Sequence, residues 1–167
     1  MNTRDLEQIV TELELSPVGS LWATLHLENS HITSITLDLS KPKTTASCQG
    51  QEMGFHLKRL LTGMGLEKFP VPFKLKGTPF QKRIWHLTAK IPPGETVSYS
   101  ELARLAKCNS PRAVGQALGK NPLPIIIPCH RVIGKNGNLT GFSSGIAIKK
   151  MLLDYERIKR HESSHNE

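Results

Sequence analysis

The stretch Ile125-Ile126-Ile127-Pro128-Cys129-His130-Arg131-Val132-Ile133-Gly134 decides how this chain is interpreted. A short run of isoleucines closed by proline is typical of a buried strand, because β-branched side chains fit a pleated surface and proline ends the ladder. The sequence therefore predicts a short strand that carries Cys129 to the edge of the core. A thiol there is inert or nucleophilic according to its charge environment, and the adjacent His130 and Arg131 can both favour the thiolate.

Composition bounds the class of protein around this stretch. The chain has 167 residues, 38% of them apolar, which suffices for one substantial domain or two small ones. Its three cysteines, Cys48, Cys108 and Cys129, are an odd number without a CxxC pair, which argues against a disulfide framework or a zinc ribbon. We expect no signal peptide, because acidic residues stand near the start where one needs an apolar core, and no apolar run approaches roughly 20 residues. We therefore expect no membrane association and a cytoplasmic, nucleoid-associated protein, or a nuclear one in a eukaryote.

The positive charge is concentrated in the half that contains Cys129. Residues 1–75 carry seven basic and eight acidic side chains, whereas residues 76–167 carry fifteen and six. This asymmetry favours a polyanionic partner such as nucleic acid. A merely soluble basic face is the alternative.

The first half is predicted to be a small α+β unit. Partial apolar alternation over residues 7–15, 19–27 and 32–39, with turn-forming segments between them, predicts a three-stranded antiparallel meander. A polar loop over 41–51 and a helix from Met53 to about Gly63 follow. The histidines here are scattered, with only Cys48 nearby, so we expect no metal site.

The second half begins with three helix signals. Thr78-Pro79 opens a helix whose apolar face includes Ile84, and Trp85 is interpreted as a core residue. Ser98 or Ser100 caps a second helix, and Ser110-Pro111 starts a third. Two short helices joined by about three residues predict a helix-turn-helix.

The third of these helices is rich in small residues, namely Ala113, Gly115, Ala117 and Gly119. Glycine inside a helix costs roughly 1 kcal/mol relative to alanine, so close approach of another surface should compensate. That surface is either a neighbouring helix or a nucleic-acid groove. Arg112, a long cation beside small residues, favours the groove.

The chain ends in a hairpin turn, a small-residue loop and a helix. Asn136-Gly137 predicts the turn, and apolar positions from Ile146 to Tyr155 predict a helix that brings Glu156 to the core edge. We expect the polar residues from Ile158 to fray. The predicted division is a scaffold domain at 1–75, a DNA-binding domain with the cysteine at 76–160 and a flexible tail at 161–167.

These residues resemble the O6-alkylguanine-DNA alkyltransferases, also called methylated-DNA-protein-cysteine methyltransferases. The resemblance spans about residues 77–156 and, more loosely, the first half. It rests on three segments at consistent spacing, which are Arg112-Ala113-Val114-Gly115, Asn121-Pro122 and Pro128-Cys129-His130-Arg131-Val132. It implies a ribonuclease H-like first domain, no cofactor, and no zinc, since the cysteines that hold zinc in some relatives are absent.

The resemblance also implies roles for the candidate catalytic residues. Cys129 would be the acceptor, whose thiolate attacks the alkyl carbon on guanine O6, or on thymine O4, and keeps the group, so that each molecule reacts once. His130 would take the thiol proton through a water, and Glu156 would orient His130. Asn121 would tie the turn before the cysteine, and Tyr99 would donate to the departing guanine.

The expected pocket is completed by four positions. The backbone of Val132, like that of Cys129, would accept from the guanine amine, Phe142 and Ser143 would line the pocket, and Lys149 would lie near it. Phe142 stands where many relatives have tyrosine, and Ser144 where many have glycine, which narrows the pocket lip and puts bulky substituents in doubt.

The implied partner is double-stranded DNA bound through its minor groove. Arg112 would fill the stack when the damaged nucleotide is flipped out, with Ala113 and Gly115 against the groove. We expect a monomer, and clustering of copies along DNA stays open.

Two other functions remain to be weighed. A non-catalytic lesion binder of the same fold would replace the acceptor cysteine, so Cys129 argues against it. A cysteine hydrolase would need Cys129 and His130 to meet, but adjacent side chains on a strand point to opposite faces.

Overall fold

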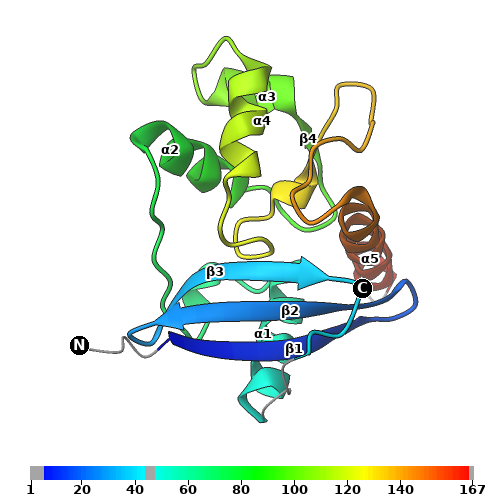
Figure 1. Ribbon diagram of the computed structural model, residues 1–167. Helices are drawn as coiled ribbons and strands as arrows, with labels where there is room; N and C mark the ends of the chain where they lie inside the picture. Colours follow the sequence, from blue (N-terminus) through cyan, green and yellow to red (C-terminus); the bar gives the residue numbers. More distant parts are fainter. Residues whose placement is uncertain (1–5, 44–47, 166–167) are drawn as a thin grey trace, which may run out of the picture.

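The first half of the chain forms a three-stranded antiparallel sheet, as the sequence predicts (Figure 1). The computed structural model describes residues 6–43 and 48–165. The strands follow one another as β1 (Leu6–Leu15), β2 (Gly19–Glu28) and β3 (His31–Asp38). Leu25 of β2 lies opposite Ile9 on one side and Ile35 on the other, so these side chains share one face and form part of the core.

Helix α1 (Cys48–Leu61) packs against β1 through two glycines. A β-carbon at Gly50 would overlap the Val10 carbonyl, and one at Gly54 would overlap the Thr11 side chain, so the helix approaches the strand more closely than larger residues allow. The predicted loop over 41–51 is too long, because the helix already begins at Cys48. Apolar periodicity starts only at Met53, whereas the first turn is fixed by this close approach; residues 44–47 lie outside the described part.

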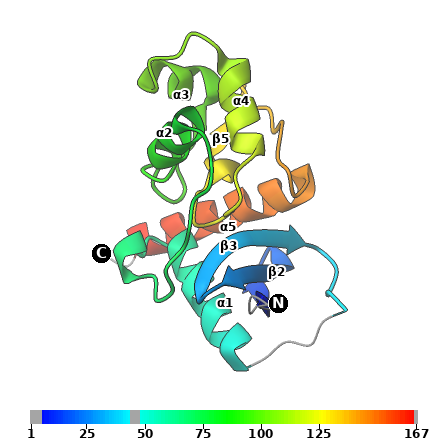
Figure 2. The same ribbon diagram turned by 60° about the vertical axis from the view of Figure 1, so that its left-hand side comes forward.

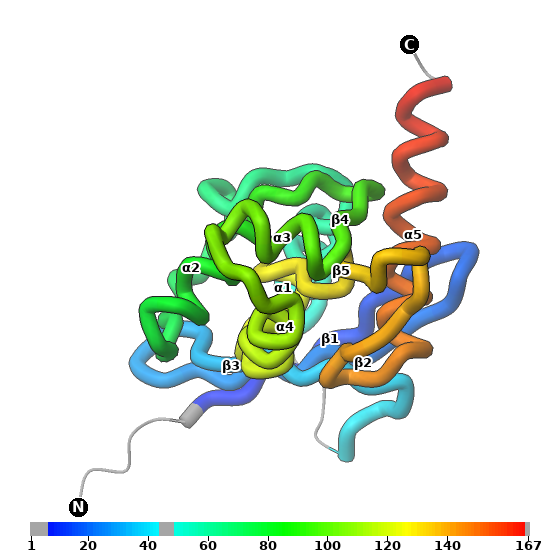
Figure 3. The backbone as a smooth tube through the Cα atoms, turned by 90° about the horizontal axis from the view of Figure 1, so that it is seen from above, coloured from blue at the N-terminus to red at the C-terminus, as the bar shows by residue number. Residues whose placement is uncertain are grey.

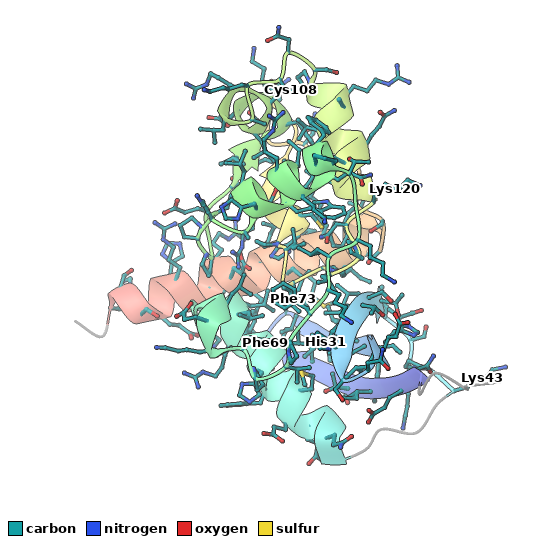
Figure 4. The ribbon with its side chains drawn as sticks, turned by 90° about the vertical axis from the view of Figure 1, so that its left-hand side faces the viewer. His31, Lys43, Phe69, Phe73, Cys108 and Lys120 are labelled. Carbon is teal, nitrogen blue, oxygen red and sulfur yellow. The ribbon has the colours of Figure 1, made fainter. Side chains whose placement is uncertain are left out.

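The outer edge of β3 is paired with segments from elsewhere in the chain. Ile32 donates to the Pro72 carbonyl at 2.9 Å and accepts from the Lys74 N–H at 2.9 Å, and Ile35 donates to the Pro122 carbonyl at 2.8 Å. Figure 4 shows Phe73 of the connecting segment close to the sheet, near His31. The sheet edge therefore contacts both the linker and the segment that leads to Cys129.

The helix-turn-helix is present with the predicted caps (Figures 1 and 3). Thr78, Ser98 and Ser110 cap the three helices, which are α2 (Pro79–Thr88), α3 (Tyr99–Leu105) and α4 (Pro111–Gly119). Trp85 is buried and donates its indole N–H to the Ala117 carbonyl at 2.9 Å, which ties α2 to α4 and confirms Trp85 as a core residue. Cys108 lies in the turn between α3 and α4, at the end of the molecule far from the sheet (Figure 4).

Residues 125–127 are buried but do not form the predicted strand. Pro124 and Pro128 flank them and lack the N–H of a ladder, and Ile125 has a φ of 74°, which is outside strand geometry. The Ile127 N–H donates to the Leu123 carbonyl at 2.8 Å, which closes a turn. Cys129 consequently lies on a 3₁₀ turn, η2 (Cys129–Arg131), directly before β5 (Val132–Ile133), which pairs in parallel with β4 (Val97–Ser98).

The last helix, α5 (Ile146–Ser164), runs between the sheet with α1 and the upper helices (Figure 2). The helix continues through Ser164, so the fraying expected from Ile158 is wrong, while the flexibility of the tail over 161–167 stays a prediction. Polar side chains stabilise this end, with Lys159 paired to Glu162 at 2.7 Å and Arg160 paired to Glu95 at 3.1 Å. In the described part of the chain, no helix is both long and apolar enough for a membrane span.

Candidate active site

Cys129 is held by the side chain of Asn121. The Asn121 amide nitrogen donates to the Cys129 sulfur at 3.0 Å and to the Ile127 carbonyl at 2.9 Å, while its oxygen accepts from the Leu123 N–H at 2.9 Å. Both side chains are buried, at 8% exposure for Asn121 and 5% for Cys129. Asn121 thus ties the two ends of the turn together, in the position expected of it, and directs a donor at the sulfur.

The charge environment of Cys129 differs from the expectation. Burial raises the pKa of the Cys129 thiol, while the Asn121 hydrogen bond and the Lys149 charge act in the opposite direction without cancelling it. The resting group is therefore a thiol that needs a base. Arg131, expected to favour the thiolate, turns away from it and binds Glu156 instead.

His130 and Glu156 form a buried pair behind the cysteine. The His130 Nε2 lies 2.8 Å from a Glu156 oxygen, and the other Glu156 oxygen accepts from the Gly94 N–H at 3.0 Å. Burial lowers the pKa of His130 although Glu156 raises it. For Glu156, burial alone would raise the pKa, but the contacts with His130 and Arg131 hold it at about 2. The pair is thus a neutral imidazole beside a carboxylate.

The free side of His130 is its Nδ1. This atom is buried without a hydrogen-bond partner among the described residues, and none of the described hydrogen bonds of His130 reaches Cys129. Since Glu156 engages Nε2, an N–H there leaves Nδ1 as the acceptor. A neutral His130 in this tautomer can take a proton.

Arg131 is the member of this cluster whose role sequence reasoning missed. It is 4% exposed and donates to Glu156 from Nε and Nη2, at 3.1 and 2.7 Å, and to the Ile91 carbonyl at 2.5 Å. The sequence carried a signal for this role, because an arginine in a segment predicted to be buried must have hydrogen-bond or ion-pair partners.

Tyr99, Lys149 and the loop before α5 form one further group of contacts. The Tyr99 hydroxyl donates to the Thr140 carbonyl at 2.8 Å, and the Lys149 ammonium donates to Thr140 at 2.9 Å and to the Val132 carbonyl at 2.6 Å. The ammonium also lies 5.6 Å from the centre of the Tyr99 ring. Burial lowers the pKa of Lys149 to about 8, and the nearby Cys129 opposes this shift. The predicted residues Tyr99, Val132 and Lys149 are therefore brought together.

The predicted pocket lip is less closely connected to this network. Phe142 is half-buried against the core, Ser143 is exposed and Ser144 is half-buried. None of the described hydrogen bonds joins these side chains to Cys129 or Tyr99. Their role in binding remains a prediction.

The predicted DNA-binding residues lie along α4. Arg112 is exposed, while Ala113 and Gly115 are half-buried. A β-carbon at Gly115 would make ordinary contact with the Tyr99 ring at 3.7 Å, and one at Gly119 would meet nothing. Packing within the chain therefore does not require glycine at either position, which favours an external surface as the reason for both.

The fold and the site together define a helix-turn-helix protein with a buried, hydrogen-bonded cysteine next to an ordered histidine and carboxylate. Residues 79–158 match the family model described as the DNA-binding domain of 6-O-methylguanine DNA methyltransferase. Two relatives at 46% and 36% identity, covered over 67% and 93% of their length, show that the chain belongs to this family of methylated-DNA–protein-cysteine methyltransferases.

The chain is similar to two curated relatives and to one solved structure. The chain is 49% identical over 92 residues to the inducible methylated-DNA–protein-cysteine methyltransferase of Bacillus subtilis, covering 54% of this chain and 51% of that one. It is 46% identical over 107 residues to the Methanosarcina mazei protein, covering 64% and 67%. The matches thus span about half to two thirds of these relatives. The Mycobacterium tuberculosis OGT, solved in complex with DNA, superposes with a TM-score of 0.66 at 36% identity, over 90% of this chain and 93% of that one.

Proposed function

We propose that this protein repairs DNA by moving an alkyl group from guanine O6 to its own Cys129. Family membership and the names of the relatives support the proposal, and one observation carries it: the buried Cys129 sulfur accepts an N–H from Asn121 at 3.0 Å. Lys149 adds a positive charge that lowers the pKa of this thiol. A donor and a cation directed at sulfur favour the thiolate, which is the form that attacks carbon.

His130 supplies the base in this reaction. The Cys129 proton passes to His130 Nδ1 through a water, and the thiolate attacks the alkyl carbon in line with the carbon–oxygen bond. The sulfur–carbon bond forms as the carbon–oxygen bond breaks, and the electron pair of the broken bond leaves with guanine. Guanine then takes up a proton, and His130 returns its own, so that the thioether is the one lasting change in the protein.

Tyr99 is the proposed donor to the departing guanine. Its hydroxyl donates to the carbonyls of Thr140 and Gly141, at 2.8 and 3.2 Å, so guanine competes with this loop for one proton. Burial raises the pKa of Tyr99, and the proximity of Cys129 acts in the same direction. The hydroxyl therefore stays protonated and able to donate at neutral pH.

The proposal makes each molecule a single-use acceptor. A dialkyl thioether has no good leaving group, so the alkyl group stays on sulfur. The alkyl–oxygen bond of O4-alkylthymine presents the same reacting atoms, and we propose it as a second substrate.

DNA is proposed to bind along α4 through its minor groove. The exposed Arg112 would occupy the position of the flipped nucleotide, and the small surface at Ala113 and Gly115 would approach the groove. The excess of basic residues in 76–167 supplies sequence-independent attraction to phosphates. A monomer suffices for this arrangement.

Duplex DNA with a radiolabelled methyl group on guanine O6 tests the proposal. We expect one equivalent of label on the protein and no further turnover. The chain offers a matched pair of variants, because Cys108 is a second described free cysteine, half-buried and remote from the site. Cys129→Ser should accept no label, whereas Cys108→Ser should accept as much as the wild type.

The outcomes separate the competing functions. Label that stays on DNA while the protein binds tightly indicates a lesion binder. Label released into solution over many turnovers indicates a hydrolase. Either result excludes the acceptor.

A further inference from the structure

The Glu156 carboxylate receives more donors than a partner of His130 needs. One oxygen lies 2.8 Å from His130 Nε2 and 2.7 Å from Arg131 Nη2, and the other lies 3.0 Å from the Gly94 nitrogen. The Arg131 Nε adds a contact of 3.1 Å to each oxygen. The carboxylate is therefore compensated by a permanent cation before His130 carries any charge.

Arg131 is anchored independently of this carboxylate. Its Nη1 donates to the Ile91 carbonyl at 2.5 Å, and its Nη2 lies 3.5 Å from the Leu60 carbonyl at the end of α1. The side chain is almost wholly buried. Its guanidinium is thus fixed beside Glu156 by two other parts of the chain.

A buried carboxylate with no other cation would draw a proton onto the imidazole it touches, because an ion pair costs less there than an isolated charge. A protonated His130 has no lone pair on Nδ1 and cannot act as a base. We propose that Arg131 is a positioning residue that neutralises Glu156 and so keeps His130 uncharged and able to take the Cys129 proton. This inference rests on the proposed function for the identity of the reaction.

Charged groups on two elements act on the pKa of His130. Glu156 and Lys149 act on it from α5, and Arg131 acts on it from η2. Burial lowers the pKa of His130, Glu156 raises it, and Arg131 and Lys149 lower it. Removing Arg131 takes away one of the influences that oppose Glu156, while burial and Lys149 remain, so the pKa of His130 should rise.

The pH dependence of single-turnover transfer tests the inference. For Arg131→Gln we expect the acid limb of the rate to move up by about one pH unit or more, so that on this limb the rate, as a fraction of its alkaline plateau, is roughly tenfold below that of the wild type. Arg131→Lys keeps the charge and should keep the limb near its wild-type position, although the plateau falls because the paired contacts are lost.

Two further variants separate charge from damage to the fold. Arg131→Gln combined with Glu156→Gln removes both charges, and the acid limb should return toward the wild-type position. Arg157→Gln removes one cation from α5, the helix that carries Glu156. Because Arg157 is exposed and pairs with Asp154, the pH profile of this variant should match the wild type. A uniform loss of rate at all pH values in Arg131→Gln, or an equal shift in Arg131→Lys, overturns the inference.

A second measurement needs no variant that must fold and no transfer activity. In ¹⁵N NMR of the wild type, we expect the His130 imidazole to be neutral at about pH 6.5, the ordinary pKa of histidine, with the proton on Nε2. A charged imidazole at about pH 7 overturns the inference. If the wild type transfers no label at any pH, the proposed function fails. The same titration of folded Arg131→Gln then decides the role of Arg131, because the pKa of His130 should rise in this variant, and an unchanged value overturns the inference.

Discussion

Replacing Asn121 separates the stability of the active-site turn from the reactivity of the thiol. Asn121→Ala removes all three hydrogen bonds of the side chain, leaving the Ile127 carbonyl and the Leu123 N–H buried without this partner. The Leu123 N–H is left unsatisfied at a cost of about 1–3 kcal/mol, while the Ile127 carbonyl still accepts from the Cys129 N–H and loses about 0.5–1.5 kcal/mol, so we expect roughly 1.5–4.5 kcal/mol of destabilisation. Asn121→Asp keeps an acceptor for Leu123 but buries a carboxylate against the Ile127 carbonyl, so it should lose at least as much.

Reactivity should also fall in both variants. In Asn121→Ala the thiolate loses a donor at 3.0 Å. A hydrogen bond to a charged group contributes about 1.5–3 kcal/mol, which corresponds to a rate reduction of roughly 10- to 150-fold. Asn121→Asp also places a carboxylate against the sulfur, and two negative charges at that distance cannot both form, so its rate should be lower still.

Rapid-quench transfer from labelled duplex measures the rate, and urea unfolding measures the stability of each variant. Free O6-benzylguanine serves as a second substrate that removes the contribution of DNA binding. Asn136→Asp is the matched control, because Asn136 is exposed in the turn after β5 and gains the same charge. If either variant, while folded, transfers from free O6-benzylguanine at the wild-type rate, the donor to the sulfur has no effect and our reasoning is refuted.

Three further predictions concern DNA, the product and pH. Arg112→Ala should slow transfer from duplex at least about tenfold while leaving free O6-benzylguanine within about twofold, and equal slowing contradicts base flipping. Methylation of the buried Cys129 should overpack its site by about 1–3 kcal/mol and lower the melting temperature by roughly 2–12 °C in differential scanning fluorimetry, so an unchanged value contradicts it. The folded protein favours neutral Lys149, with a pKa of about 8 against an ordinary 10.5. Relative to Lys149→Met, the wild type should therefore gain up to about 3 kcal/mol in free energy of unfolding as pH rises from 8 to 10.5, and a pH-independent difference in urea unfolding contradicts this.

The sequence predicts the elements that local chemistry determines. Thr78, Ser98 and Ser110 cap the helices because each hydroxyl reaches an N–H three residues on, a requirement that depends on no distant residue. Strand alternation in the first half likewise identifies the sheet. The roles of Cys129 and His130 are predicted from the resemblance to the family.

The errors occur where tertiary contacts override a local pattern. The isoleucines at 125–127 have the composition of a strand, but two prolines and the Asn121 side chain close them into a turn. The end of α5 is polar, which in the sequence predicts fraying. The helix continues there, and Arg160 forms an ion pair with Glu95, which is distant in the sequence. Arg131 stands two residues after Cys129, so the sequence suggests that it acts on the thiol. In the structure its partner is Glu156, 25 residues away.

The first half of the chain reaches the site through backbone groups. The Ile35 N–H donates to the carbonyl of Pro122, next to Asn121, and the Leu60 carbonyl lies 3.5 Å from Arg131 Nη2. Such contacts depend on where the backbone runs and not on which side chain it carries. The sheet and α1 can therefore exchange core side chains of similar volume without altering the turn that presents Cys129. The first half supports the chemistry by fixing this turn from outside, and none of its described side chains needs to enter the reaction.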